Sequence, residues 1–173
     1  KNKFAEFEAR KIPYSEQLRL QTERDQKQLA AKYAAAVAAR RDPTGDDLYY
    51  LGLLHWVAEN LDGTFDALSK YLARDDKAAE KAQTARSLIT VIAAKQRKFD
   101  QASSVLADYL KNQPTKASER SRMESEIAKA YIAEKKTSEA VPHASEAYRN
   151  AKAILLDGGI TQRGLDEVLD TGM

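Results

Sequence analysis

The sequence predicts an all-α protein made of stacked antiparallel helix pairs, and three observations support this. Apolar residues recur at three- and four-residue steps through most of the chain, which is the period of an amphipathic helix. Strand-favouring runs are lacking, and only seven glycines and four prolines interrupt the 173 residues. The stretch 87–114 reads as two helices joined by the polar turn KQRKFDQ, and similar units precede and follow it.

The first region, residues 1–45, predicts a helical lead-in that packs on the rest of the chain. Residues 1–12 are weakly amphipathic, and Pro13 ends that segment. From Ser15 to about Arg41 no helix breaker occurs, and strong helix formers dominate. The apolar stripe of this long helix is narrow, so we expect its alanines to pack closely against a neighbour. A coiled-coil or partner-binding helix is the alternative, although the heptads are poor.

The next unit begins with a predicted capping box, Thr44 with Asp47 three residues later. Its first helix is rich in aromatic and branched apolar residues. We expect this helix to break at Asp62-Gly63, with Thr64 capping a return helix that ends near Ala73.

Two further helix pairs follow, and together the three pairs fill residues 46–156. The second runs from about Lys77 to Pro114, with Asp100 expected to cap its return helix. The third lies between Pro114 and about residue 156, with Thr137 expected as the cap. Residues 157–173 open with Gly158-Gly159 and are interpreted as a linker and a partial helix over 161–169.

The return helices open with alanines at related positions, Ala67, Ala102 and Ala140, and the first interval is slightly shorter than the second. In the third unit Ile127, Ala128 and Tyr131 follow a large–small–aromatic pattern. With this spacing, residues 46–156 resemble three tetratricopeptide repeats, whose period is about 34 residues. The resemblance implies a tetratricopeptide-like α-α superhelix, with small residues at 52, 90 and 128 where the paired helices approach closely.

That resemblance also implies a concave groove lined by the first helix of each unit, a surface suited to an extended peptide or a partner helix. The groove positions carried over from the family are Tyr49, Leu53, Trp56, Ser87, Val91, Lys95, Arg122, Ser125 and Lys129. Their mixture of aromatic and basic residues favours an acidic or carboxylate-ended peptide. The expected function is a non-enzymatic protein–protein interaction scaffold. The cluster of Trp56 with Tyr49 and Tyr50 is either core packing or a binding hot spot.

A second resemblance covers the segment DLYYLGLLHWVAENLDGTFDALSKYLA after a long alanine-rich helix. It is similar to the helical regions that precede the thioredoxin-like domain of some bacterial exported thiol-disulfide oxidoreductases. This resemblance implies an N-terminal, non-catalytic extension that positions or dimerises a redox domain absent from this chain. It also implies a periplasmic or other extracytoplasmic location. Separately, the first residue is lysine rather than methionine, which suggests a processed or excised chain.

No residue pattern predicts catalysis, a cofactor or a metal. The chain has no cysteine, and its two histidines, His55 and His143, have no serine or acid at a triad-like spacing. Glu124 and Glu126 flank one residue and therefore point to different faces of a helix. The acidic pairs 46–47 and 75–76 fall at helix starts, where they stabilise the helix dipole.

The charge balance favours neither nucleic acid nor membrane, and the repeat resemblance implies a protein or peptide partner. The formal net charge of +2 produces no overall field toward nucleic acid or membrane, and no apolar run reaches the ~18 residues of a membrane span. A basic strip around Lys95, Arg97 and Lys98 is either a solvated helix face or a contact for an acidic partner. The oligomeric state does not follow from the sequence.

Overall fold

The structure is a computed structural model that describes residues 10, 15–41 and 43–156, and within those ranges it is all-helical with no strand. Seven helices make up the described part: α2 (Glu16–Ala38), α3 (Gly45–Val57), α4 (Leu61–Leu72), α5 (Ala79–Lys95), α6 (Phe99–Lys111), α7 (Ala117–Ala133) and α8 (Thr137–Leu156). The predicted all-α class is confirmed. The segments expected over 1–12 and 161–169 lie outside the described residues.

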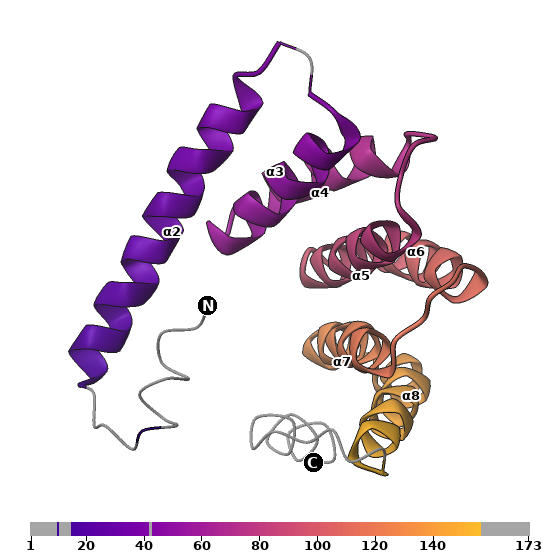
Figure 1. Ribbon diagram of the computed structural model, residues 1–173. Coiled ribbons are helices and arrows are strands. Elements are labelled where there is room, and N and C mark those ends of the chain that lie inside the picture. The colour runs from indigo at the N-terminus through magenta and orange to yellow at the C-terminus, as the bar shows by residue number, and fades with distance from the viewer. Residues whose placement is uncertain (1–9, 11–14, 42, 157–173) are drawn as a thin grey trace.

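The helices form three antiparallel hairpins, α3–α4, α5–α6 and α7–α8, stacked one on the next (Figure 1). The long helix α2 lies against α3 at one end of the stack. In the second junction the first helices α5 and α7 lie side by side, whereas the first junction is made mainly between α4 and α5. The prediction of stacked hairpins with a long N-terminal helix is therefore confirmed.

Helix α2 contacts the stack through its C-terminal half. Its buried residues are Ala30 and Ala34, and Lys27 Nζ lies 2.7 Å from Glu59 Oε1 at the α3–α4 turn. Leu29 and Tyr33, by contrast, are more than half exposed. The alanines thus allow the close approach to α3, and the larger apolar residues face solvent.

A residue with left-handed backbone geometry follows the first helix of each hairpin. These residues are Glu59, Arg97 and Lys135, with φ of 59°, 60° and 60°, and they are evenly spaced along the chain. The second helices begin at Leu61, Phe99 and Thr137, which are spaced in the same way. The array therefore has one constant period, the interval from Glu59 to Arg97, which we call the turn period.

The turn period corrects the predicted register of the first unit. Thr64, not Ala67, stands one turn period before Ala102, and Thr64 is fully buried. Thr64 lies inside α4, where its hydroxyl donates to the carbonyl oxygen of Asn60 at 2.9 Å. The cap of α4 is Asn60, whose Oδ1 accepts from the Gly63 amide at 2.9 Å. With Thr64 in place of Ala67, the first unit has the same spacing between its two helices as the later units.

The other two predicted caps of return helices are also displaced. Lys98 is the N-cap residue of α6, and Asp100 lies in the first turn of that helix. Thr137 is itself the first residue of α8. In both units the helix starts earlier than a polar-cap signal indicates, because the left-handed residue before it reverses the chain direction.

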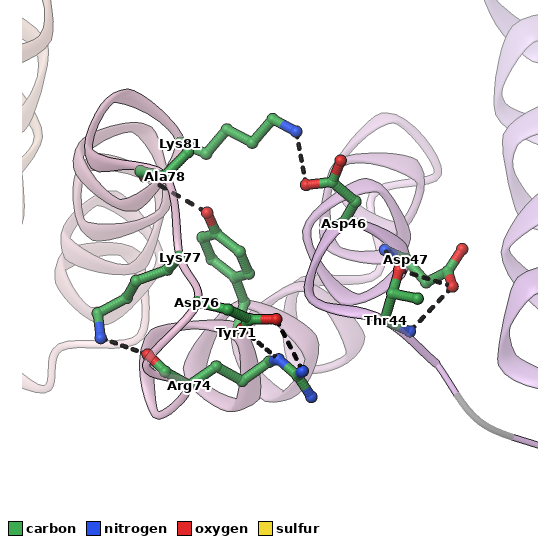
Figure 2. A network of polar contacts seen from close by, with 9 residues as sticks. All are labelled: Thr44, Asp46, Asp47, Tyr71, Arg74, Asp76, Lys77, Ala78 and Lys81. Atoms are coloured by element: carbon green, nitrogen blue, oxygen red, sulfur yellow. Dashed lines mark hydrogen bonds and ion pairs between the residues drawn. The ribbon is translucent and has the colours of Figure 1, made fainter.

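The predicted capping box at the start of α3 is confirmed. The Asp47 amide donates to Thr44 Oγ1 at 3.2 Å, and the Thr44 amide donates to Asp47 Oδ2 at 3.0 Å (Figure 2). The hydrogen bonds from Thr44 hold the pKa of the Asp47 carboxyl below its ordinary value. This cap fixes where the chain leaves α2 and enters the stack.

The junction between the first and second hairpins is held by polar contacts around a buried tyrosine (Figure 2). The Tyr71 hydroxyl lies 3.4 Å from the carbonyl oxygen of Ala78, the N-cap residue of α5. Lys81 of α5 forms an ion pair with Asp46 of α3 at 2.6 Å, and Arg74 pairs with Asp76 in the connecting loop at 2.7 Å. These contacts set the position of α5 relative to the first hairpin.

The core consists of two apolar clusters that share helix α5. One lies between the first and second hairpins and contains Tyr49, Leu68, Tyr71, Ala82, Ala85, Leu88 and Ile89. The other lies between the second and third and contains Val91, Ala93, Ala94, Ala102, Leu106, Tyr109, Met123, Ile127 and Ala130. Because α5 supplies residues to both, it is the most buried helix and the centre of the stack.

Candidate functional site

Four of the nine predicted groove positions are buried. Tyr49, Ser87, Val91 and Ser125 all lose nearly all contact with solvent, and Val91 belongs to the core cluster that includes residues of α7. The placement of these four side chains in an open groove is therefore wrong. For Ser87 and Val91 the physical reason is the central position of α5, because α7 covers the helix face that spacing alone marks as a groove, whereas Tyr49 packs against Tyr71 of α4.

The other five positions reach the surface. Leu53 and Trp56 are partly buried against the core, whereas Lys95, Arg122 and Lys129 are exposed. The Lys95 ammonium lies over the Trp56 ring, 5.8 Å from its centroid. The structure thus brings together positions from the first and second units. Trp56 packs against both core clusters, which favours the core-packing interpretation for most of its ring.

The exposed cations of the third unit differ in their partners. The Arg122 guanidinium donates to the Ser87 hydroxyl at 2.9 Å, so it contacts the preceding unit through a neutral group. Lys129 lies 3.4 Å from Glu126 on its own helix. Arg122 and Lys95 are therefore held in place by a hydroxyl and an aromatic ring, and their positive charge is not neutralised by these partners.

These contacts belong to a regular pattern between successive first helices. Ser87 contacts Arg122, and Thr84 donates to Glu119 at 3.1 Å; each pair is separated by 35 residues. The ion pair of Asp46 with Lys81 has the same separation. These three pairs give the contacts between successive first helices a common register.

A second basic surface, at the hairpin turns, is larger than the predicted strip of Lys95, Arg97 and Lys98. Arg97 Nε lies 3.2 Å from Glu134 at the third turn, which brings Lys135 and Lys136 to the same edge of the stack. Alignment of the turns at the turn period reveals this, because QRK at residues 96–98 and EKK at residues 134–136 then occupy equivalent places. The interval from Ala102 to Ala140 equals the turn period, so the alanine alignment of these two units already contains this signal.

The two histidines have structural partners. His143 Nδ1 lies 2.7 Å from the buried carboxylate of Glu124, and its ring stacks on Tyr131. His55 Nδ1 lies 3.2 Å from the Asn60 side-chain amide. Across the described ranges, no three His, Cys, Asp or Glu side chains gather as they would around a metal ion.

Neither protein-family models nor curated proteins nor solved structures include a match to this chain. Within residues 15–41 and 43–156, no helix combines the length and the apolar character required to cross a membrane. The function is therefore inferred from the geometry of the chain's own residues.

Proposed function

We propose that this chain is a non-enzymatic protein–protein interaction scaffold that binds an extended acidic peptide along its first helices. The binding face consists of Leu53, Trp56, Lys95, Arg122 and Lys129. The observation that carries the proposal is the state of Lys95 and Arg122, which are exposed and held by neutral partners. An incoming carboxylate can pair with each without first breaking an internal ion pair.

The spacing of the two cations suits an extended chain. Arg122 contacts Ser87, and Lys95 lies two helical turns further along α5, which corresponds to about 12 Å of helix axis. An extended peptide covers that distance in about four residues, and residues four apart point to the same face. Two carboxylates at positions i and i+4 of the peptide would therefore reach both cations.

The experiment uses an acetylated peptide, Asp-Ala-Val-Ala-Asp, and follows backbone amide shifts of the protein by NMR during titration. We expect shifts on α5 and α7 and loss of binding when Lys95, Arg122 and Lys129 are replaced by alanine. The matched control replaces three exposed lysines elsewhere, Lys32, Lys111 and Lys152, and should leave the affinity unchanged. Equal affinity for the first triple variant and the native protein would discard this binding face.

A further inference from the structure

Large apolar side chains are exposed on the two helices at the N-terminal end of the stack. Leu29 and Tyr33 on α2 and Tyr50 and Val57 on α3 have exposed fractions between 47% and 54%. Single apolar residues on a surface are common, whereas several on adjacent helices are typical of an interaction site. We call these four residues the apolar patch.

Two ion pairs fix how α2 lies against α3. Lys27 of α2 pairs with Glu59, two residues beyond α3, at 2.7 Å. Arg40, two residues beyond the end of α2, pairs with Asp47 in the first turn of α3. The two helices are therefore antiparallel neighbours (Figure 1). Their register sets two pairs of residues at equal levels: Leu29 with Val57, and Tyr33 with Leu53.

The apolar patch lies on one side of this helix pair. On α2, its two residues each come one residue before a buried alanine. On α3, Tyr50 and Val57 come one residue before Leu51 and Ala58, which are half-buried and continue the stripe that begins at Asp47 and faces α2. Two antiparallel helices are related by a twofold axis perpendicular to their common plane, so residues one position before the contact residues lie on the same side of both.

The apolar patch continues the binding face proposed above. Tyr50, Leu53 and Val57 recur at three- and four-residue steps, so they share one face of α3, and Leu53 belongs to the binding face. Trp56 is next to Val57 in the chain, and the Lys95 ammonium lies 5.8 Å from the centroid of its ring. A ligand that pairs with Lys95 therefore has the apolar patch beside it.

Equivalent positions of the array change from apolar to basic along the stack. Val57 stands one turn period before Lys95, and Leu53 stands two turn periods before Lys129. Both lysines are exposed cations of the binding face. The same places therefore present an apolar surface on α3 and a positive surface on α5 and α7. A ligand that spans them needs acidic residues at one end and apolar residues at the other.

We propose that the partner is an amphipathic acidic peptide, whose carboxylates pair with Lys95 and Arg122 and whose large apolar residues cover the apolar patch. This inference rests on the proposed function and adds the composition of the peptide. Adjacent helix axes lie about 8–10 Å apart. Side chains two and four residues beyond the carboxylate at Lys95 lie about 7 and 13 Å further along an extended chain, which brings them to α3 and toward α2.

The test measures the binding of acetylated peptides to the full chain by isothermal titration calorimetry. One peptide extends Asp-Ala-Val-Ala-Asp with Ala-Leu-Ala-Leu at its C-terminus, and another carries Leu-Ala-Leu-Ala at its N-terminus, so both chain directions are covered. At least one should bind about tenfold more tightly than its counterpart with serine in place of both leucines, because the leucines bury apolar surface. Equal affinities of the leucine and serine peptides in both directions would overturn the inference.

The role of the apolar patch is tested by changing the protein. Leu29→Ala with Tyr33→Ala should remove most of the gain from the leucines and leave the affinity for the serine peptides unchanged. The matched control, Val141→Ala with Tyr148→Ala, removes an aliphatic residue and a tyrosine of similar exposure from α8 and should keep the gain. Circular dichroism checks that each variant is folded. A gain that persists in the α2 variant would discard the apolar patch as the site.

Two further measurements separate this inference from its alternatives. If the native protein binds the serine peptides and the Lys95, Arg122 and Lys129 triple variant does not, the proposed function stands whatever the leucines do. Leucine peptides that bind the triple variant as tightly as the native protein would show that the acids are not recognised, which overturns both proposals. Sedimentation of the free chain tests for a second copy. A dimer that Leu29→Ala with Tyr33→Ala dissociates would assign the apolar patch to that second copy and overturn the inference alone.

Discussion

Tyr71 and Tyr109 stand one turn period apart, and their hydroxyls contact the backbone at equivalent places in successive units. Tyr71 lies 3.4 Å from the carbonyl oxygen of Ala78, and Tyr109 lies 3.3 Å from that of Lys116. Ala78 and Lys116 are the N-cap residues of α5 and α7, and neither helix has a side-chain cap. A buried tyrosine on each of the first two return helices therefore fixes the start of the next unit.

The hydroxyls of the two tyrosines make different numbers of contacts, so removing each hydroxyl should have a different effect on stability. The Tyr109 hydroxyl also accepts from the Lys116 amide at 2.7 Å and lies 3.0 Å from Glu119 Oε2. We expect Tyr109→Phe to lower the free energy of unfolding by about 1–3 kcal/mol, because the Lys116 amide and the Glu119 carboxylate each lose a hydrogen bond. Tyr71→Phe should cost less than about 1 kcal/mol, because only one long contact is removed. Urea denaturation measures both, and equal losses would contradict the difference in contacts.

Tyr109 also predicts how stability depends on pH. Burial raises the pKa of the Tyr109 phenol from its ordinary value of 10.0 to about 12. As the pH rises, the Tyr109 phenol therefore ionises in the unfolded chain before it ionises in the folded chain. The contribution of this tyrosine to the free energy of unfolding is intact below pH 10 and is lost as the pH rises through 12. Denaturation between about pH 9 and 12 should show a steeper decline for the native protein than for Tyr109→Phe. The exposed Tyr148 provides the control, and Tyr148→Phe should follow the native slope.

The sequence predicts the helices well and the turns between them less well. The capping box of Thr44 with Asp47 is a local signal, because its hydrogen bonds join residues three apart, and the structure confirms it. The turns are reversed by Glu59, Arg97 and Lys135, whose types carry no turn signal. The aspartate and glycine at 62–63 favour a break further along the chain instead. Thr64 and Ala67 both lie on the buried face of α4, so residue size alone cannot show which of them is equivalent to Ala102 in the next unit.

The candidate site is only partly predictable from the sequence, because the exposure of its residues depends on how the hairpins pack. Helical spacing places Val91 and Lys95 on one side of α5, and both are found there. Spacing does not reveal that α7 covers Val91 and leaves Lys95 exposed, because that depends on how adjacent hairpins pack. The basic surface at the hairpin turns beyond Lys98 could be found from the sequence, because the interval from Ala102 to Ala140 equals the turn period and aligns residues 96–98 with residues 134–136.

At Gly52, α3 packs tightly against Leu68 of α4. A β-carbon at this position would lie 2.4 Å from Leu68 Cδ2 and 2.5 Å from Leu68 Cγ, so the leucine must move. We expect Gly52→Ala to destabilise the protein by about 1–3 kcal/mol through overpacking. In a double-mutant cycle with Leu68→Ala, the two losses should not add, because the shorter side chain removes the clash. Additive losses in denaturation experiments would contradict this contact.

Glu124 and Glu126 provide a comparison between a buried and a partly exposed acid on one helix. Glu124 is buried beside His143, with Arg120 Nε at 3.7 Å, whereas Glu126 pairs with Lys129 near the surface. We expect Glu124→Ala to lower the free energy of unfolding by about 1–3 kcal/mol, because the partly buried His143 and Arg120 lose a buried carboxylate partner. Glu126→Ala should cost less than about 1 kcal/mol. Thermal and urea denaturation of both variants test the contrast, which similar losses would contradict.

Lys135 provides the clearest test of the geometry that the three turns share. Its φ of 60° lies in the left-handed region, where a β-carbon costs about 1–2 kcal/mol and glycine carries no such penalty. We expect Lys135→Gly to raise the free energy of unfolding by only about 0.5–1 kcal/mol, since glycine also gains freedom in the unfolded chain. Lys129→Gly, which removes the same side chain from the interior of α7, should lower it by about 1 kcal/mol. Urea denaturation of the pair should therefore give changes of opposite sign. A loss of stability in Lys135→Gly would mean that the third turn does not have the geometry of Glu59 and Arg97, and the common period of the array would fail with it.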